Sequence, residues 1–283
     1  MTTPLITAES AFQTLSDLIR GYALAQPEAL ALRDPHVTLS YAALNARMDQ
    51  VASALQRDGV TPGQCIALCA TSSVDYACVF LGALRAGVVV APLAPSVTPQ
   101  ILTGMFKDAQ ARLLFLDAAA RALVEPAMDS LPRIALDGSE AGSAYTAWLA
   151  TAGSTPQAVS VGPEAPFNII YSSGTTGIPK GIVQPHGMRW MHMRRGLTYG
   201  YSPATRSLVS TPLYSNTTLV VVFPTLALGG CVELRARRVA VRARLLVAVR
   251  RGPERVVLGA VDQRAERRGR FGDRGQCELP CGR

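Results

Sequence analysis

The sequence lacks a membrane-length apolar run and a recognisable leader. The longest strongly apolar stretch, 219–228, is about half as long as a bilayer crossing requires, and it contains Pro224. Residues 1–11 have no basic segment followed by an apolar one, so we expect no secretory signal. Because 48% of the residues are hydrophobic and available for a core, these absences predict a soluble, cytoplasmic globular protein with no transmembrane segment.

The cysteines also lack the spacing of a metal site or a redox pair. There are six of them, none in paired C-x-x-C motifs and none followed by a histidine pair: Cys65, Cys69, Cys78, Cys231, Cys277 and Cys281. The first three lie in apolar sequence, where a reduced thiol behaves as a small hydrophobic side chain. We therefore predict no metal site, and we expect these thiols to pack in a core rather than to act in redox chemistry.

Excess positive charge is absent from most of the chain. The net charge is +8, from 28 Lys and Arg against 20 Asp and Glu. Residues 1–234 hold 14 basic and 15 acidic residues, whereas residues 235–283 hold 14 arginines and 5 acidic residues, so the excess belongs to the tail alone. This distribution predicts no specific nucleic-acid partner. Binding of nucleic acid through the tail is the weakest of the functions considered.

Helical and strand patterns alternate along the first two hundred residues, which predicts an α/β domain with parallel sheets flanked by helices. We expect helices at 12–26, 41–58, 74–86, 98–109, 118–128, 144–151 and 187–195. We expect strands at 29–32, 37–40, 65–70, 88–93, 113–116, 133–136, 167–170, 182–183 and 231–234. Residues 137–165 are rich in Gly, Ser, Ala and Pro and are otherwise expected to form surface loop.

One loop carries the pattern of a phosphate-binding site. After the strand at 167–170 come Ser172, Ser173, Gly174, Thr175, Thr176 and Gly177, and then Lys180. Small residues let backbone N–H groups close around phosphate oxygens, hydroxyls add further hydrogen bonds, and a lysine supplies positive charge. The loop is not a Walker loop, because Lys180 lies between proline and glycine instead of preceding Ser or Thr. An ordinary Ser/Gly-rich turn is the alternative, and the completeness of the pattern favours nucleotide binding.

This loop resembles the signature of the adenylate-forming (AMP-binding) superfamily, which includes acyl-CoA synthetases, aryl-CoA ligases, luciferases and peptide-synthetase adenylation domains. Shorter matches follow the family's order at 39–44, 84–93, His186 and 211–214. The resemblance covers residues 8 to about 234. It implies a partial large N-terminal domain of the adenylate-forming fold, followed by an anomalous Arg-rich tail.

The resemblance implies an activity and a set of site residues. Such enzymes react a carboxylic acid with ATP to give acyl-adenylate and pyrophosphate, and a thiol such as coenzyme A then displaces AMP. By this likeness the loop residues 172–177 hold the β- and γ-phosphates, Lys180 is the catalytic cation, and Mg²⁺ accompanies the ATP. Tyr214, Ser215 and Asn216 border the acid pocket. The resemblance implies a carboxylic acid of the fatty or aryl class. Ser215 stands where the family commonly has a histidine, which leaves more room and no titratable group in the pocket, so the acyl preference stays open.

The tail departs from this resemblance. Residues 235–283 use only eleven amino-acid types, including 14 arginines and no lysine, serine or threonine. We interpret the tail as an out-of-frame translation or, alternatively, as a disordered basic segment. The family's later segments for adenine, ribose and the second catalytic lysine are absent, so we expect weak activity or none. A non-catalytic nucleotide-binding remnant or regulatory module is the alternative function, and the oligomeric state stays open.

Two groups of polar residues are interpreted as structural. His36, beside Pro35, is expected to be a solvated turn residue. Arg189, His192, Arg194 and Arg195 lie on the helix expected at 187–195, where we favour a solvated charged face over an anion-binding patch.

Overall fold

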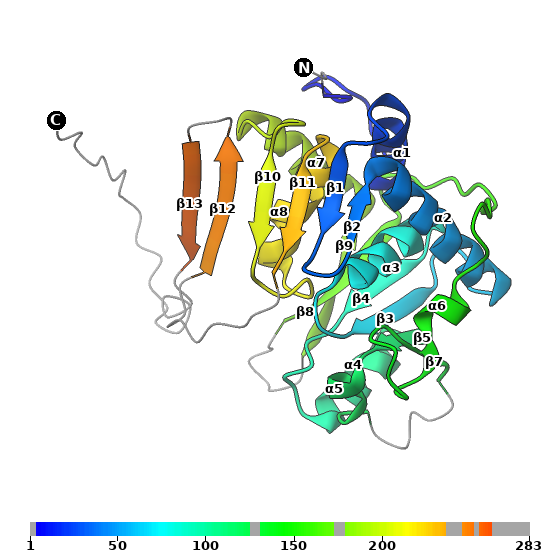
Figure 1. Cartoon of the computed structure of the whole chain (residues 1–283). Helices are drawn as coiled ribbons and strands as arrows, with labels where there is room; N and C mark the ends of the chain where they lie inside the picture. Colours follow the sequence, from blue (N-terminus) through cyan, green and yellow to red (C-terminus); the bar gives the residue numbers. More distant parts are fainter. Residues whose placement is uncertain (1–3, 125–130, 173–178, 236–244, 252–254, 262–283) are drawn as a thin grey trace.

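The computed structural model describes residues 4–124, 131–172, 179–235, 245–251 and 255–261, and they form two β-sheets with α-helices between and outside them (Figure 1). The larger sheet has the strand order β7-β6-β5-β3-β4-β8-β9, and the smaller has the order β13-β12-β10-β11-β1-β2. In the larger sheet every neighbouring pair is parallel except β8 and β9. In the smaller sheet, β1, β11 and β10 are parallel and the outer pairs are antiparallel.

The strands of the larger sheet are β3 (Cys65–Cys69), β4 (Val89–Pro92), β5 (Ala111–Leu116), β6 (Arg133–Ala135), β7 (Ser143–Ala144), β8 (Pro166–Ser172) and β9 (Lys180–Pro185). Those of the smaller sheet are β1 (Leu30–Arg33), β2 (Thr38–Ser40), β10 (Arg206–Val209), β11 (Cys231–Leu234), β12 (Leu245–Arg251) and β13 (Arg255–Val261). The central strand β3 is buried along its whole length, as a strand covered on both faces must be.

The helices are α1 (Leu15–Ala25), α2 (Tyr41–Arg57), α3 (Val74–Arg85), α4 (Pro99–Asp108), α5 (Ala118–Arg121), α6 (Tyr145–Trp148), α7 (His186–Thr198) and α8 (Asn216–Ala227). Side-chain caps define several starts: Ser40 accepts a hydrogen bond from the N–H of Ala43, and Ser73 accepts one from Tyr76. Gly87, at φ +69°, ends α3 by turning the chain left-handed into β4.

Two hydrophobic clusters lie on opposite faces of the larger sheet. One joins both sheets through α1, α2, α3, α7 and α8, and the other fills the space between the larger sheet and helices α4 and α5. Along β8, Ile170 belongs to the first cluster and Ile169 to the second, as the alternation of a strand requires. The end of β8 therefore has two differently packed faces, and this arrangement positions the candidate site.

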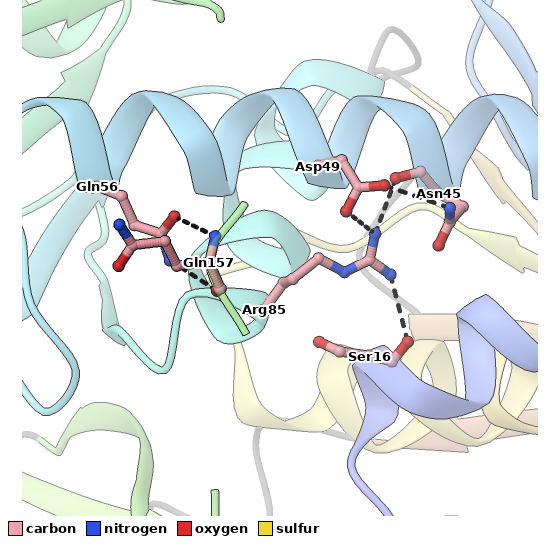
Figure 2. A network of polar contacts seen from close by, with 6 residues as sticks. All are labelled: Ser16, Asn45, Asp49, Gln56, Arg85 and Gln157. Carbon is pink, nitrogen blue, oxygen red and sulfur yellow. Dashed lines mark hydrogen bonds and ion pairs between the residues drawn. The ribbon is translucent and has the colours of Figure 1, made fainter. Parts of the chain in front are cut away.

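A buried polar network fixes the helices around α3 (Figure 2). The guanidinium of Arg85 donates to the Asp49 carboxylate at 2.9 Å, to the carbonyl of Asn45 at 2.8 Å and to the carbonyl of Ser16 at 3.3 Å. The Arg85 side chain is 2% exposed. Because its partners lie on α1 and α2, this arginine joins three helices and has a full negative counter-charge.

A second polar pair in Figure 2 attaches the segment that precedes β8. The side chain of Gln56, on α2, accepts a hydrogen bond from the N–H of Gln157 at 2.8 Å and donates to its carbonyl at 3.0 Å. Both backbone groups of Gln157 are thereby paired. This single amide gives the irregular segment a fixed place on α2.

Most of the predicted elements are confirmed. One helix is shorter than expected, strands β7 and β10 are not among the predictions, and α8 is the helix that the resemblance implies after Tyr214. The helix expected at 118–128 ends at Arg121, since residues 122–124 form turns, and 125–130 lie outside the described residues. Strand β10 has no counterpart among the predictions, because its sequence Arg-Ser-Leu-Val is too short to show a clear period. In the Arg-rich tail, the described residues 245–251 and 255–261 form strands that continue the smaller sheet beyond β10.

The predicted packing of Cys65, Cys69 and Cys78 is confirmed, and Cys231 is buried as well. Cys65, Cys69, Cys78 and Cys231 are buried and free, and burial raises the pKa of the Cys65 and Cys69 thiols to about 12. Among the described residues, no group of three or more His, Cys, Asp or Glu has the arrangement of a metal site. None of the described helices combines the length and apolar character needed to cross a bilayer.

Candidate nucleotide site

The candidate site is built on the antiparallel hairpin β8–β9. Ser172 and Lys180 are register partners at the end of this hairpin, and both are exposed. The residues between them that carry the rest of the predicted loop, Ser173, Gly174, Thr175, Thr176 and Gly177, lie outside the described residues. The structure thus places the first and last members of the predicted phosphate site side by side at an edge of the larger sheet.

One face of the hairpin is anchored to α4. The Tyr171 hydroxyl donates to the Asp108 carboxylate at 2.6 Å and lies 3.0 Å from the Met105 carbonyl. Burial, followed by the hydrogen bond to Asp108, raises the pKa of Tyr171, so this hydroxyl keeps its proton. Gly181 allows the close approach, because a Cβ there would lie 2.9 Å from an Asp108 carboxylate oxygen.

The other face of the hairpin contacts α7 and α8. Asn168 pairs with Gln184, and Ile170 pairs with Ile182, in the same register that pairs Ser172 with Lys180. Because alternate residues of a strand project to the same face, these three pairs share one face of the hairpin. Lys180 therefore projects to the same side of the sheet as the helix that follows the predicted acid pocket.

Arg189 of α7 lies at the centre of that face. It is 1% exposed and donates to Asn168 Oδ1 at 3.0 and 3.2 Å, to Gln184 Oε1 and to Asn216 Oδ1 at 2.9 Å. Its guanidinium carbon lies 5.7 Å from the ring centre of Phe167 and 5.4 Å from that of Phe223. Burial lowers the pKa of Arg189 to about 10, and within the described part of the chain no carboxylate pairs with it.

Burial of Arg189 corrects the interpretation of α7 as a solvated charged face. Arg195 is exposed and fits that interpretation, and Arg194 and His192 are partly buried. Arg189 instead points into the protein because α7 packs with this side against β8, β9 and α8. Its partners are separated from it by 5 to 27 residues in sequence, so no local pattern marks it as buried.

The predicted acid-pocket segment turns from β10 into α8. Leu213 donates its N–H to the Ser72 hydroxyl at 2.8 Å, and Ser215 is the N-cap of α8 without a side-chain cap bond. Tyr214, Ser215 and Asn216 are all partly buried. Among the described contacts, Asn216 reaches the hairpin through Arg189, whereas no hydrogen bond joins Tyr214 or Ser215 to Ser172 or Lys180.

His186 opens α7 as a core residue. It is 3% exposed, and its ring lies edge-on to Phe167 with the ring centres 4.9 Å apart. Burial lowers the pKa of His186 to about 4, so the imidazole is neutral at pH 7. The histidine thus contributes packing beside the hairpin and no positive charge. His36, by contrast, is exposed, as predicted.

Comparison with known proteins identifies the relatives of this fold and sequence. The family model of the AMP-binding enzymes matches residues 20–256. The chain is 31% identical over 226 residues to an L-proline–[L-prolyl-carrier protein] ligase of Pseudomonas fluorescens, a match that covers 78% of this chain and 44% of that protein. It is 32% identical over 177 residues to a fatty acid–[acyl-carrier-protein] ligase of Streptomyces coeruleorubidus, a match that covers 62% of this chain and 33% of that protein.

A solved structure shares the architecture. The N-terminal domain of FACL13 from Mycobacterium tuberculosis superposes with a TM-score of 0.68 at 22% identity, covering 81% of this chain and 58% of that one. This likeness confirms the predicted α/β fold. The matched part of the chain covers less than half the length of each of these two curated relatives.

Proposed function

The chain belongs to the AMP-binding enzyme family, and we propose that it contributes the nucleotide-binding part of a ligase that activates a carboxylic acid with ATP. The pairing of Ser172 with Lys180 is the observation that carries this proposal. It holds the two ends of a Ser, Thr and Gly-rich loop together at an exposed sheet edge. In the proposed site, backbone N–H groups and hydroxyls of residues 172–177 and the ammonium of Lys180 bind the triphosphate.

The proposed reaction has two steps. A carboxylate oxygen of the acid attacks the α-phosphorus of ATP, a new C–O–P link forms, and the bond to the β-phosphate breaks to release pyrophosphate. A thiol then attacks the acyl carbon, and AMP leaves. In the first step Lys180 stabilises the negative charge that accumulates on the leaving pyrophosphate, while residues 172–177 position it.

The acid is proposed to be a fatty or aryl acid. Tyr214 and Ser215 offer hydroxyl groups and apolar surface but no charge, and the Asn216 side-chain oxygen is already occupied by Arg189. A pocket bordered by such residues favours a substrate whose body is apolar, because a charged body would lose hydration without gaining a partner.

Coenzyme A is the proposed thiol acceptor, and Mg²⁺ is proposed to accompany ATP. The two relatives described above are named as carrier-protein ligases, so a carrier-protein thiol is the acceptor to compare with coenzyme A. The magnesium ion is proposed to bind to the phosphates of ATP.

The family domain is proposed to occupy residues 8–234, with an out-of-frame or disordered tail at 235–283 and little activity in this chain alone. The family match continues past residue 234 to residue 256, and β12 pairs with β10 and with β13. The boundary at residue 234 is therefore the part of this proposal to test first. Translation of the DNA in the other two frames after codon 234 decides it. If neither frame encodes the family's later segments, the frameshift explanation fails.

ATP binding tests the nucleotide-binding proposal directly. Replacing Lys180 with glutamine removes the proposed cation, so ATP affinity measured by equilibrium dialysis should fall about tenfold or more. The sequence contains one other lysine, Lys107, which is exposed on α4, so Lys107→Gln is the matched control. Equal ATP affinity of wild type and Lys180→Gln would contradict the assignment of Lys180.

Exchange of pyrophosphate into ATP separates the ligase from the alternative, a non-catalytic nucleotide-binding remnant. The ligase predicts exchange that depends on one of a panel of fatty and aryl acids and is lost in Lys180→Gln. A chain that binds ATP but shows no acid-dependent exchange supports the remnant, and transfer to coenzyme A or to a carrier protein identifies the acceptor.

A further inference from the structure

The buried guanidinium of Arg189 is the polar group of this fold that simple packing explains least. It is 1% exposed, its hydrogen-bond partners are three neutral side-chain amides, and its Nη1 has no partner among the described residues. The side-chain nitrogen of Asn168 beside it also has none within the part of the chain that the structure describes. A cation buried without a counter-charge destabilises a fold unless several dipoles are oriented toward it.

The three hydrogen-bond partners of Arg189 lie on three different elements, β8, β9 and α8, whose relative positions matter for the proposed reaction. Asn168 and Gln184 are cross-strand partners on β8 and β9. Asn168 lies four residues before Ser172, and Gln184 lies four residues after Lys180. Asn216 is the first residue of α8 and the last of the three proposed pocket residues. One planar group therefore joins both strands of the nucleotide hairpin to the start of the pocket helix.

The geometry of Arg189 suits a rigid joint. Nη2 carries two hydrogens and faces three acceptor oxygens, so the three amides share one donor group. The aromatic rings of Phe167 and Phe223 lie near the guanidinium. A shift of the hairpin relative to α8 would break at least one of these bonds in a place that water does not reach, which makes the shift costly.

We propose that Arg189 is a positioning residue that couples the nucleotide hairpin to the acid pocket. This inference rests on the proposed function. When ATP binds at the hairpin, it restricts the motion of Asn168 and Gln184. Their hydrogen bonds to Arg189, and that of Arg189 to Asn216, then restrict the start of α8, so the pocket helix is ordered before the acid attacks ATP. The residue itself touches neither ATP nor the acid.

Hydrogen exchange of the full chain, with and without Mg-ATP, tests the coupling. In wild type, ATP should slow amide exchange in two segments, 180–185 and 213–220, the second by about fivefold or more. Asn216→Ala removes only the hydrogen bond between Arg189 and α8. ATP should therefore still slow exchange at 180–185 but no longer slow it at 213–220. Arg189→Met should behave in the same way, while Arg195→Met, an exposed position on the same helix, should match wild type.

The outcomes are distinguishable. A folded Asn216→Ala or Arg189→Met protein in which ATP still protects 213–220 as in wild type overturns the role of Arg189. If Arg189→Met does not fold, Asn216→Ala decides alone, because Asn216 is only partly buried. If ATP leaves 180–185 unaffected in wild type, the proposed nucleotide site is wrong and the positioning role is overturned with it.

Discussion

Two buried arginines in this protein have opposite surroundings. Arg85, in the region of α1, α2 and α3, pairs with the Asp49 carboxylate and with two backbone carbonyls. Arg189, beside the hairpin β8–β9, contacts only amide oxygens and aromatic rings among its described partners. The first arrangement neutralises its charge and joins helices, as a stabilising contact does. The second leaves a buried charge without a carboxylate partner among the described residues, next to the proposed site, which is what the proposed positioning role requires.

Removal of Arg85 is expected to have the largest effect. Arg85→Met leaves the partly buried Asp49 carboxylate and the carbonyls of Ser16 and Asn45 without the donor that a 2% exposed side chain supplies, so the free energy of unfolding should fall by roughly 2–3 kcal/mol. Urea denaturation measures it. The matched control is Arg47→Met, which breaks the pair with Asp75, whose two side chains are 31% and 28% exposed, and should cost roughly 0–1 kcal/mol. Equal losses for the two variants would remove the distinction between the buried arginine and the partly exposed one.

Near the hairpin, the free energy of unfolding should depend on pH through His186. The folded-state pKa of His186 is about 4, below the ordinary value of 6.5, so the unfolded chain binds the proton more readily. The stability that comes from burying the neutral His186 imidazole is fully present above pH 6.5 and is lost as the pH falls toward 4. Between pH 8 and pH 5 the free energy of unfolding should decrease by about 2 kcal/mol from this group.

Urea titrations at several pH values measure this slope. His186→Gln should flatten the slope, whereas His36→Gln, which replaces an exposed imidazole, should leave it in place. A slope unchanged in His186→Gln would assign the acid sensitivity to other groups.

A pair of glycine substitutions has the smallest expected effect. Gly181→Ala brings a Cβ to 2.9 Å from Asp108 and 3.2 Å from the Tyr171 ring, which should cost about 1 kcal/mol. Gly104 lies inside α4, and a methyl group added there would meet no described atom within 4 Å, so Gly104→Ala should stabilise by about 0.5–1 kcal/mol. Thermal unfolding of both variants measures the two shifts. Shifts of the same sign would contradict the close packing of the hairpin on α4.

The sequence predicts the order of most helices and strands because their periods and caps are local. Ser40 and Ser73 precede apolar helical patterns, and Gly87 ends one, so these boundaries follow from neighbouring residues. The short strand β10 has no such signal and is not predicted. The helix predicted at 118–128 is too long, because apolar residues continue past the point where the backbone turns.

The candidate site is predictable only in part. Ser172 and Lys180 follow from the loop pattern, and the structure pairs them across the hairpin. The prediction of a solvated Arg189 is wrong because its partners, Asn168, Gln184 and Asn216, meet only once the hairpin and two helices have packed. The signal that points to its burial is the cluster of amide side chains at these positions, which is visible only after folding.

The two lysines of this chain allow the contact of Lys180 with ATP to be tested in one experiment. Both are exposed, Lys180 at the proposed phosphate site and Lys107 on α4. Acylation of the full chain with a limiting amine reagent, with and without Mg-ATP, is followed at each lysine by mass spectrometry. If Lys180 contacts the phosphates, ATP slows modification of Lys180 several-fold and leaves the modification of Lys107 unchanged. Equal modification of Lys180 with and without saturating ATP would contradict it.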